Sequence, residues 1–251
     1  MNVAVIMPAA GLGTRMGRAA AEKTGTSRKQ FMLLAGSPIL LHTVRKFAAS
    51  PRVREIVVAV RSEDVAWVEG ILAAEFPGGR ARVVEGGDSR QESVENALRS
   101  LQPDTDLVAV HDAVRPFIDL ETIDKVFDEA AATGAAIVGV VPVDTVKQVS
   151  QTTGHARIRA TLPREKLVLA QTPQVFRFDL LRRAFETARE DDFIGTDEAS
   201  LVERLEVEVS VVLGSDRNIK ITKPGDMELA WLFHREELER QAAGAPGEAD
   251  L

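Results

Sequence analysis

Short runs of apolar, often β-branched residues alternate along the chain with longer stretches in which apolar residues recur at helical spacing. This alternation is typical of a parallel sheet whose strands are joined by helices that cover both of its faces. We therefore expect an α/β fold with a mostly parallel, twisted sheet. The strands are predicted at residues 3–7, 55–60, 82–85, 107–110, 136–141 and 207–213.

Helix starts can be located between these strands. Ser37 and Pro38 form an N-cap followed by a first-turn proline, which predicts a helix to about residue 49. Residues 89–92 fit a capping box that opens a helix to about residue 101, and Pro224 opens the last helix. The apolar stripes expected in the core are Val94, Ala97, Leu98 and Leu101 in one helix and Met227, Ala230, Trp231, His234 and Leu238 in the other.

The segment at about 142–169 breaks this rhythm. Residues 143–149 and 158–162 each alternate, with Thr153 and Gly154 as a turn between them, so we expect a two-stranded arm. A lone hairpin is marginally stable in water, which favours packing of the arm on a second copy of the chain. We predict one domain over residues 1–240 that includes this arm, followed by a disordered tail at 241–251.

Composition narrows the class of protein. The 251 residues include 31 Lys and Arg against 38 Asp and Glu, a formal net charge of −7 at pH 7, so we expect no nucleic-acid partner. The absence of cysteine excludes disulfides, thiolate nucleophiles and cysteine zinc sites, and fits a reducing cytoplasm. No signal peptide and no membrane-spanning run is recognised. We expect a cytoplasmic protein that does not contact membranes.

The turn after the first predicted strand is rich in small residues, which are Pro8, Ala9, Ala10, Gly11 and Gly13. Small residues at the carboxyl end of a parallel strand let backbone N–H groups approach a phosphate closely. The dinucleotide fingerprint does not fit, because the third glycine falls one place late and residues 31–42 contain no acid. A Walker A loop does not fit either, because the Gly-Lys pair is missing.

Positive charge is concentrated at this turn in an otherwise acidic chain. Between residues 9 and 30 the only acid is Glu22, and the five basic residues are Arg15, Arg18, Lys23, Arg28 and Lys29. This local excess predicts a polyanionic ligand, although Arg18 and Lys23 taken singly are better explained as bystanders.

Polar residues also follow the other predicted strands. Gly87, Asp88 and Ser93 offer partners suited to a cytosine ring, although Asp88 and Ser89 could equally serve to cap the helix. Asp112 could hold Mg²⁺, whereas the neighbouring His111 is interpreted as structural. A last group provides donors for a second anion: Arg164, residues 171–174, residues 196–198 and residues 218–222.

These segments together resemble one family. They read PAAGLGTRM at 8–16, KQ at 29–30, GGDSRQES at 86–93, HDAVRP at 111–116, TPQ at 172–174, TDEAS at 196–200 and NIKIT at 218–222. The chain is similar, over residues 2–235, to the 2-C-methyl-D-erythritol 4-phosphate cytidylyltransferases of the non-mevalonate isoprenoid pathway. The resemblance implies a Rossmann-like nucleotidyltransferase domain, a protruding β-arm, a homodimer, CTP as co-substrate and Mg²⁺ or another divalent cation.

The resemblance also implies roles for individual residues. The catalytic residues would be Arg15, Lys29, Arg164 and Lys220. The CTP site would comprise Pro8, Ala9, Ala10, Gly11, Gly13, Arg15, Lys29, Gly87, Asp88, Ser93 and Asp112, with Asp112 near the metal. The sugar phosphate would be held by Arg115, Arg164, Thr172, Thr196 and Lys220, with Arg164 and Thr172 reaching in from the partner's arm.

The residue types match the chemistry that the family carries out. The nucleophile would be a phosphate oxygen of methylerythritol phosphate, which is largely dianionic at pH 7 because the second pKa of a phosphate monoester is about 6. Such a nucleophile needs no general base, and the motifs contain no His–carboxylate dyad. The expected reaction is in-line attack on the α-phosphate of CTP, which gives 4-diphosphocytidyl-2-C-methyl-D-erythritol and pyrophosphate.

Two departures from the family pattern bear on the site. The loop between Met16 and Lys29 is longer than the family usually has, so the choice of Lys29 over Lys23 depends on the Gln30 and Phe31 that follow it. Arg217 stands where relatives often have Asp, which removes one expected substrate contact.

Three other functions are considered. A cytidylyltransferase for another polyol phosphate, such as ribitol 5-phosphate, shares the HDxxRP and TPQ segments, but Ala9-Ala10-Gly11 and TDEAS favour methylerythritol phosphate. A nucleotide-binding dehydrogenase is opposed by the missing fingerprint. A non-catalytic nucleotide-binding module is opposed by the presence of Arg15, Lys29 and Lys220.

Overall fold

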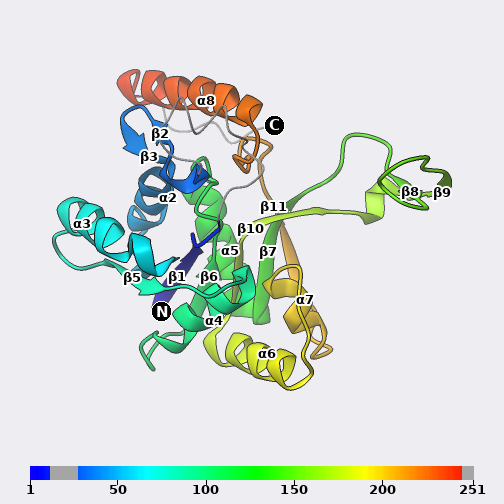
Figure 1. Ribbon diagram of the computed structural model, residues 1–251, viewed down its shortest axis with the longest axis horizontal. Coiled ribbons are helices and arrows are strands. Elements are labelled where there is room, and N and C mark those ends of the chain that lie inside the picture. Colours follow the sequence, from blue (N-terminus) through cyan, green and yellow to red (C-terminus); the bar gives the residue numbers. More distant parts are fainter. Residues whose placement is uncertain (12–27, 245–251) are drawn as a thin grey trace.

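A seven-stranded sheet forms the centre of the computed structural model, which describes residues 1–11 and 28–244 (Figure 1). The strand order is β11-β7-β10-β6-β1-β4-β5. The strands of this sheet are β1 (Val3–Pro8), β4 (Val53–Val60), β5 (Ala81–Glu85), β6 (Leu107–Val110), β7 (Ala135–Val140), β10 (Leu169–Arg177) and β11 (Ser210–Leu213).

The sheet is mostly parallel, as the sequence predicts. Strand β1 pairs in parallel with β4 and β6, β4 pairs with β5, and β7 pairs with β11. Strand β10 runs antiparallel to both of its neighbours, β6 and β7. Because helices cover both faces, β6 is an apolar run that is buried along its whole length, and β1 is apolar and buried from Val3 to Met7.

Two helical layers enclose this sheet. One core cluster contains apolar side chains of α2 (Ile39–Ala48), α3 (Val65–Glu75) and α5 (Leu120–Thr133). The cluster on the other face contains side chains of α4 (Arg90–Arg99), α6 (Phe178–Glu190) and α7 (Glu198–Glu203). The prediction of helices on both faces is therefore confirmed.

Of the predicted helix starts at Ser37 and at Ser89, the structure confirms the second and contradicts the first. The capping box of α4 is present, with Ser89 as N-cap and Glu92 as its reciprocal partner, and the predicted stripe from Val94 to Leu101 is buried. The prediction that Ser37 is an N-cap is wrong. Ser37–Pro38 forms the short strand β3, which pairs with β2 (Leu33–Leu34), and α2 begins one residue after Pro38.

The last helix also corrects a prediction. Helix α8 (Pro224–Ala242) begins at Pro224 as expected, but of its predicted core stripe Ala230 is buried while Trp231 and Leu238 are half exposed. The reason is that α8 lies along the outside of the molecule over a small third cluster, beyond α2 (Figure 1). Gln241 and Ala242, placed in the predicted tail, belong to α8, and residues 245–251 of that tail lie outside the described residues.

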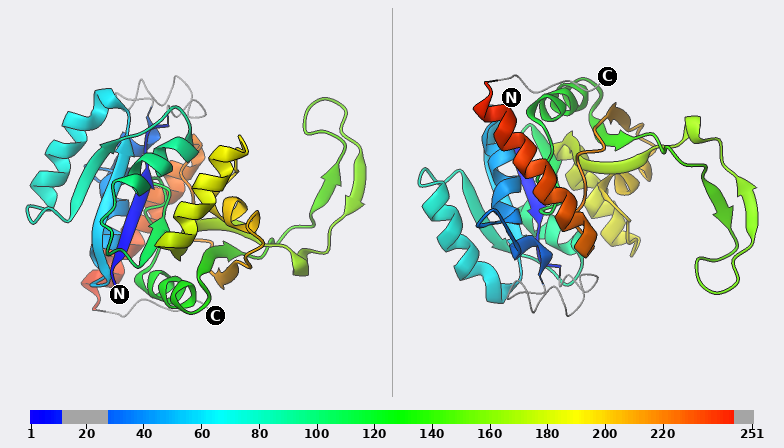
Figure 2. Two further views of the ribbon diagram at one scale, coloured as in Figure 1. Left: turned by 90° about the horizontal axis from the view of Figure 1, so that it is seen from below. Right: turned by 90° about the horizontal axis from the view of Figure 1, so that it is seen from above.

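The arm projects away from the sheet beyond β7 and β10 in all views (Figures 1 and 2). It carries the antiparallel strands β8 (Lys147–Val149) and β9 (Ile158–Thr161) and a short 3₁₀ helix, η4 (Arg164–Lys166). Val143 and Ile158 are 75% and 65% exposed. Within the described ranges, no helix combines the length and apolar character needed to cross a membrane.

Candidate active site

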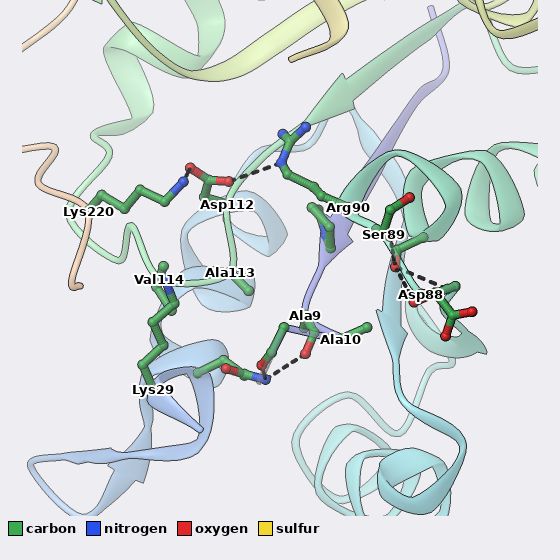
Figure 3. Close-up of a pocket in the computed structure, with 15 residues that line it drawn as sticks. Ala9, Ala10, Lys29, Asp88, Ser89, Arg90, Asp112, Ala113, Val114 and Lys220 are labelled. Carbon is green, nitrogen blue, oxygen red and sulfur yellow. Dashed lines mark hydrogen bonds and ion pairs between the residues drawn. The ribbon is translucent and has the colours of Figure 1, made fainter. Parts of the chain in front are cut away.

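A pocket lies at the carboxyl ends of β1, β5 and β6, where the connecting loops converge (Figure 3). This is the edge at which open parallel sheets bind ligands. The pocket brings together ten of the predicted site residues: Pro8, Ala9, Ala10, Gly11, Lys29, Gly87, Asp88, Ser93, Asp112 and Lys220. Gln30, Ser89, Arg90, Ala113 and Val114 complete its lining. Gly13 and Arg15, together with Lys23, lie outside the described residues.

The glycine-containing turn after β1 forms one wall. The N–H of Ala9 donates to the carbonyl of Ala59 over 2.7 Å, so the sheet fixes the start of the turn. The 3₁₀ helix η2 (Lys29–Phe31) packs beside it and places Lys29 on the pocket. Phe31 anchors η2 because its ring is buried and meets the edge of Trp67 at 4.9 Å between ring centroids.

The loop between β5 and α4 forms the opposite part of the lining. The Ser93 hydroxyl accepts from the N–H of Gly87 over 3.1 Å and donates to the carbonyl of Ser89 over 2.8 Å. Ser93 therefore holds the shape of the loop, and the exposed Asp88 side chain stands at the pocket. Ser89 caps α4, which confirms the capping interpretation for that residue.

Gly86 allows this loop to approach the turn after β1, and Gly87 allows it to pack closely against the first turn of α4. A Cβ added to Gly86 would lie 2.9 Å from the Cβ of Ala10, and one added to Gly87 would lie 2.4 Å from the Cβ of Glu92. Both distances are shorter than a carbon–carbon contact allows. The close approach of the loop to the turn after β1 and to α4 therefore requires glycine at positions 86 and 87.

Asp112 faces three cations, of which Lys220 and Arg90 are drawn in Figure 3. Its carboxylate lies 2.8 Å from the Lys220 ammonium, 3.2 Å from Nε of Arg115 and 3.6 Å from Nε of Arg90. Burial would raise the pKa of this carboxyl group, but Lys220, Arg90 and Arg115 lower it well below its ordinary value. Asp112 is thus ionised at neutral pH, although it is 7% exposed.

The partner of Arg90 is a residue that the sequence did not predict. The Arg90 guanidinium forms two hydrogen bonds to the carboxylate of Glu198, over 2.7 and 2.9 Å, and Glu198 is 1% exposed. The pair joins α4 to α7, and its Arg90 lines the pocket. Both residues lie within the quoted motifs, but a local pattern gives no sign of a contact across 108 positions.

The remaining predicted residues lie near the pocket or away from it. The Thr172 hydroxyl accepts from the N–H of Asp112 over 3.0 Å, and the Arg115 guanidinium donates to the carbonyl of Asn218 over 2.7 Å. Thr196 is exposed just before α7. The expectation that Thr172 reaches out from the arm is wrong, because Thr172 is buried in β10 and bonded within its own chain.

Arg164 belongs to the arm and is not part of this chain's pocket. It starts η4 and its guanidinium donates to the carbonyl of Val143. The side chain is exposed. Its predicted role in holding a sugar phosphate would therefore require the pocket of another copy.

Two further residues are accounted for by packing. Arg217 donates to the carboxylate of Glu236 over 2.7 Å and lies 4.3 Å from the centre of the Phe233 ring, so it faces α8. His111 is fully buried, 4.7 Å from the Phe47 ring, and burial lowers its pKa to about 4. A neutral buried imidazole agrees with the structural interpretation of His111.

The side chains present fit a divalent cation held mainly by a nucleotide. Within residues 1–11 and 28–244, no three His, Asp or Glu side chains converge as metal ligands would. Mg²⁺ on nucleotides takes one or two carboxylates and completes its shell with phosphates and water. Asp112 offers one such oxygen, because among the described residues its Oδ1 has Arg90 as its ion-pair neighbour, at 3.6 Å, beyond hydrogen-bond distance.

Comparisons with known proteins agree on one family. The sequence model of the 2-C-methyl-D-erythritol 4-phosphate cytidylyltransferase family matches residues 3–236. Proteins of that name from Solibacter usitatus and Acidobacterium capsulatum are 77% identical over 240 residues and 52% identical over 241 residues. Both alignments cover 96% of this chain, and they cover 98% and 100% of the two relatives.

Solved structures give the same result. The crystal structure of 2-C-methyl-D-erythritol 4-phosphate cytidylyltransferase from Thermus thermophilus superposes with a TM-score of 0.72 at 32% identity. The superposition covers 94% of this chain and 100% of that one. The Rossmann-like nucleotidyltransferase fold expected from the sequence is thereby confirmed.

Proposed function

Because the chain belongs to the 2-C-methyl-D-erythritol 4-phosphate cytidylyltransferase family, we propose that the pocket at the ends of β1, β5 and β6 is where it carries out that family's reaction. The chain is a nucleotidyltransferase that transfers CMP from CTP to 2-C-methyl-D-erythritol 4-phosphate and releases pyrophosphate. The observation that supports this location is the convergence of the glycine-containing turn, Lys29, Lys220 and Asp112 on one pocket.

The reaction needs positive charge more than it needs a proton acceptor. A phosphate oxygen of the methylerythritol phosphate attacks the α-phosphorus of CTP in line, and the bond to the bridging oxygen of pyrophosphate breaks. Two anions must approach each other and a third must leave, so preorganised cations lower the barrier. Lys29 and Lys220 line the described pocket, and Arg15 is proposed as a third cation by family resemblance.

The two substrates would use different parts of the site. The turn at residues 8–11 would hold the triphosphate, and Gly87, Asp88 and the loop shaped by Ser93 would face the cytosine. Lys220 would hold the sugar phosphate. Three further residues would complete the site of the sugar phosphate. Arg115 and Thr172 contact Asp112, and Thr196 lies just before α7.

A divalent cation, Mg²⁺ in our proposal, would be held by Asp112 and the phosphates of CTP. When bound it would supply additional positive charge at the phosphates. The protein's own contribution is to keep the Asp112 carboxylate ionised and oriented, which its three cationic neighbours and the hydrogen bond from its N–H to Thr172 accomplish.

We further propose that two copies of the chain assemble through their arms, so that Arg164 reaches the pocket of its neighbour. Support comes from the exposed apolar side chains of Val143 and Ile158 and from the position of Arg164 outside its own pocket. A cytoplasmic location, which the lack of cysteine favours, also stays a prediction.

The decisive assay measures pyrophosphate released from CTP and Mg²⁺ with methylerythritol phosphate and with ribitol 5-phosphate side by side. We expect release with methylerythritol phosphate and background release with ribitol 5-phosphate. Comparable release with both would favour a cytidylyltransferase of broader polyol specificity. Release with neither would favour a nucleotide-binding module without catalysis.

A further inference from the structure

We propose that Gln30 is a positioning residue that orients the turn after β1 for phosphate binding. Its side-chain amide holds two backbone carbonyls of that turn away from the nucleotide. The inference rests on the proposed location of the CTP triphosphate at residues 8–11. In the sequence, Gln30 serves only to identify the family segment that contains Lys29, and the structure gives it a role of its own.

The contacts of Gln30 are specific to the turn. Its Nε2 donates to the carbonyl of Ala9 over 2.6 Å and to the carbonyl of Gly11 over 3.1 Å. The side chain is 3% exposed, so water does not compete for these bonds. One amide group therefore uses both of its N–H donors on two acceptors of the same short turn.

The geometry of the peptide bond turns these contacts into an orientation. In a trans peptide the C=O and the following N–H point in opposite directions. When Gln30 holds the Ala9 carbonyl on its own side, the N–H of Ala10 points away from Gln30. Ala10 lines the pocket, where an N–H group attracts phosphate oxygens and a carbonyl oxygen would repel them.

The same residue links the turn to a proposed catalytic side chain. Gln30 and Lys29 are consecutive in η2, which the buried Phe31 anchors. The two hydrogen bonds of Gln30 therefore also set the separation between the Lys29 backbone and the turn. A single side chain fixes the phosphate-binding backbone and one of the cations in a common frame.

Two variants distinguish the effect of the N–H donors of Gln30 from the effect of its side-chain volume. Q30M has similar length and no donor, and Q30E has the same shape but presents acceptors to the two carbonyls. Inorganic triphosphate and cytidine are titrated into each variant by calorimetry in buffer containing Mg²⁺. We expect triphosphate binding to weaken about tenfold in Q30M, from the loss of buried hydrogen bonds, and further in Q30E, with cytidine binding unchanged.

The controls decide between positioning and general stability. Q102E, at an exposed glutamine, should match the wild type. Thermal melts identify a temperature at which each variant is folded; should Q30E not fold, Q30M alone carries the test. A purely structural role would weaken triphosphate and cytidine equally, and Q30M that binds triphosphate like the wild type would overturn the inference.

Measurements on the wild-type protein distinguish the proposed location of the triphosphate from the proposed role of Gln30. If it does not bind inorganic triphosphate in competition with CTP, the proposed location of the triphosphate is wrong. If it does, and the Gln30 variants bind triphosphate equally well, only the positioning role is wrong. Steady-state kinetics add a second readout, because KM for methylerythritol phosphate should not change in Q30M.

Discussion

At Asp112 a single carboxylate faces three cations, and this excess of positive charge supports the proposal that the pocket binds phosphates. One negative charge cannot neutralise Lys220, Arg90 and Arg115 together. Glu198 balances Arg90 through two hydrogen bonds, so the five residues carry a net positive charge around two buried carboxylates. Such a charge attracts an anionic ligand strongly because the local dielectric is low.

Lys29 contributes from a different element, and its removal gives the sharpest test at the residue scale. We expect K29A to lose on the order of 10² to 10³ in kcat, the scale for one preorganised transition-state donor, with a smaller rise in the KM for CTP. Steady-state kinetics of pyrophosphate release measure both. K125A, at an exposed lysine of α5, is the matched control. A change confined to the KM for CTP would contradict a catalytic role.

At the scale of elements, the Arg90–Glu198 pair joins α4 to α7 and can be tested for its contribution to stability. E198Q removes the buried carboxylate that is hydrogen-bonded to Arg90, and Asp112, at 3.6 Å and shared with two other cations, does not replace it, so we expect the free energy of unfolding to fall by about 3–5 kcal/mol. The double variant R90M/E198M removes both charges and should recover most of that loss. Urea denaturation of the two variants measures this. E198Q within about 0.5 kcal/mol of the wild type would show that the pair is dispensable.

The double variant also tests whether Arg90 matters for Asp112. If the pair only joins α4 to α7, R90M/E198M should recover activity to the same extent as it recovers stability, relative to the wild type. If Arg90 also orients the Asp112 carboxylate, which it faces at 3.6 Å, activity should stay low after stability is restored. Comparing kcat with the free energy of unfolding in the same preparation distinguishes the two cases.

The elements that the sequence predicted are those whose signals are local. The capping box of α4 lies within four consecutive residues, and the parallel strands are short apolar runs flanked by turns, so both could be found. Strand β10 was missed because polar residues and Pro173 interrupt its alternation. The exposure of Trp231 could not be foreseen, because periodicity shows which side of a helix is apolar and not what covers it.

The same distinction between local signals and long-range contacts applies to the residues of the site. The pocket residues at the ends of β1, β5 and β6 were predictable because each follows a recognisable strand. The contacts of Glu198 with Arg90 and of Thr172 with Asp112 join segments 108 and 60 positions apart, and only the folded chain shows them. The family resemblance supplied residues without their partners. This is why Thr172 was assigned to the arm.

For the whole molecule, the arm is the element on which the proposed sharing of one active site by two chains depends. It extends away from the sheet (Figure 2). Its apolar side chains Val143 and Ile158 are exposed, and Arg164 lies in the arm and not in the lining of its own pocket. Exposed apolar surface on a protruding hairpin favours burial against a second copy. Analytical ultracentrifugation at micromolar concentration should therefore find a dimer, and the double variant V143D/I158D should shift it toward the monomer.

A mixed dimer tests whether Arg164 completes the pocket of its neighbour. K29A and R164A chains, each with its own affinity tag, are co-expressed and the heterodimer is purified through both tags. If Arg164 acts across the interface, one site of the heterodimer combines an intact Lys29 with an intact Arg164, and the other site lacks both. The heterodimer should then show about half the activity of the wild-type dimer, although each parent homodimer is impaired at both of its sites. If Arg164 instead served its own chain, both sites of the heterodimer would carry one lesion, and mixing would restore nothing.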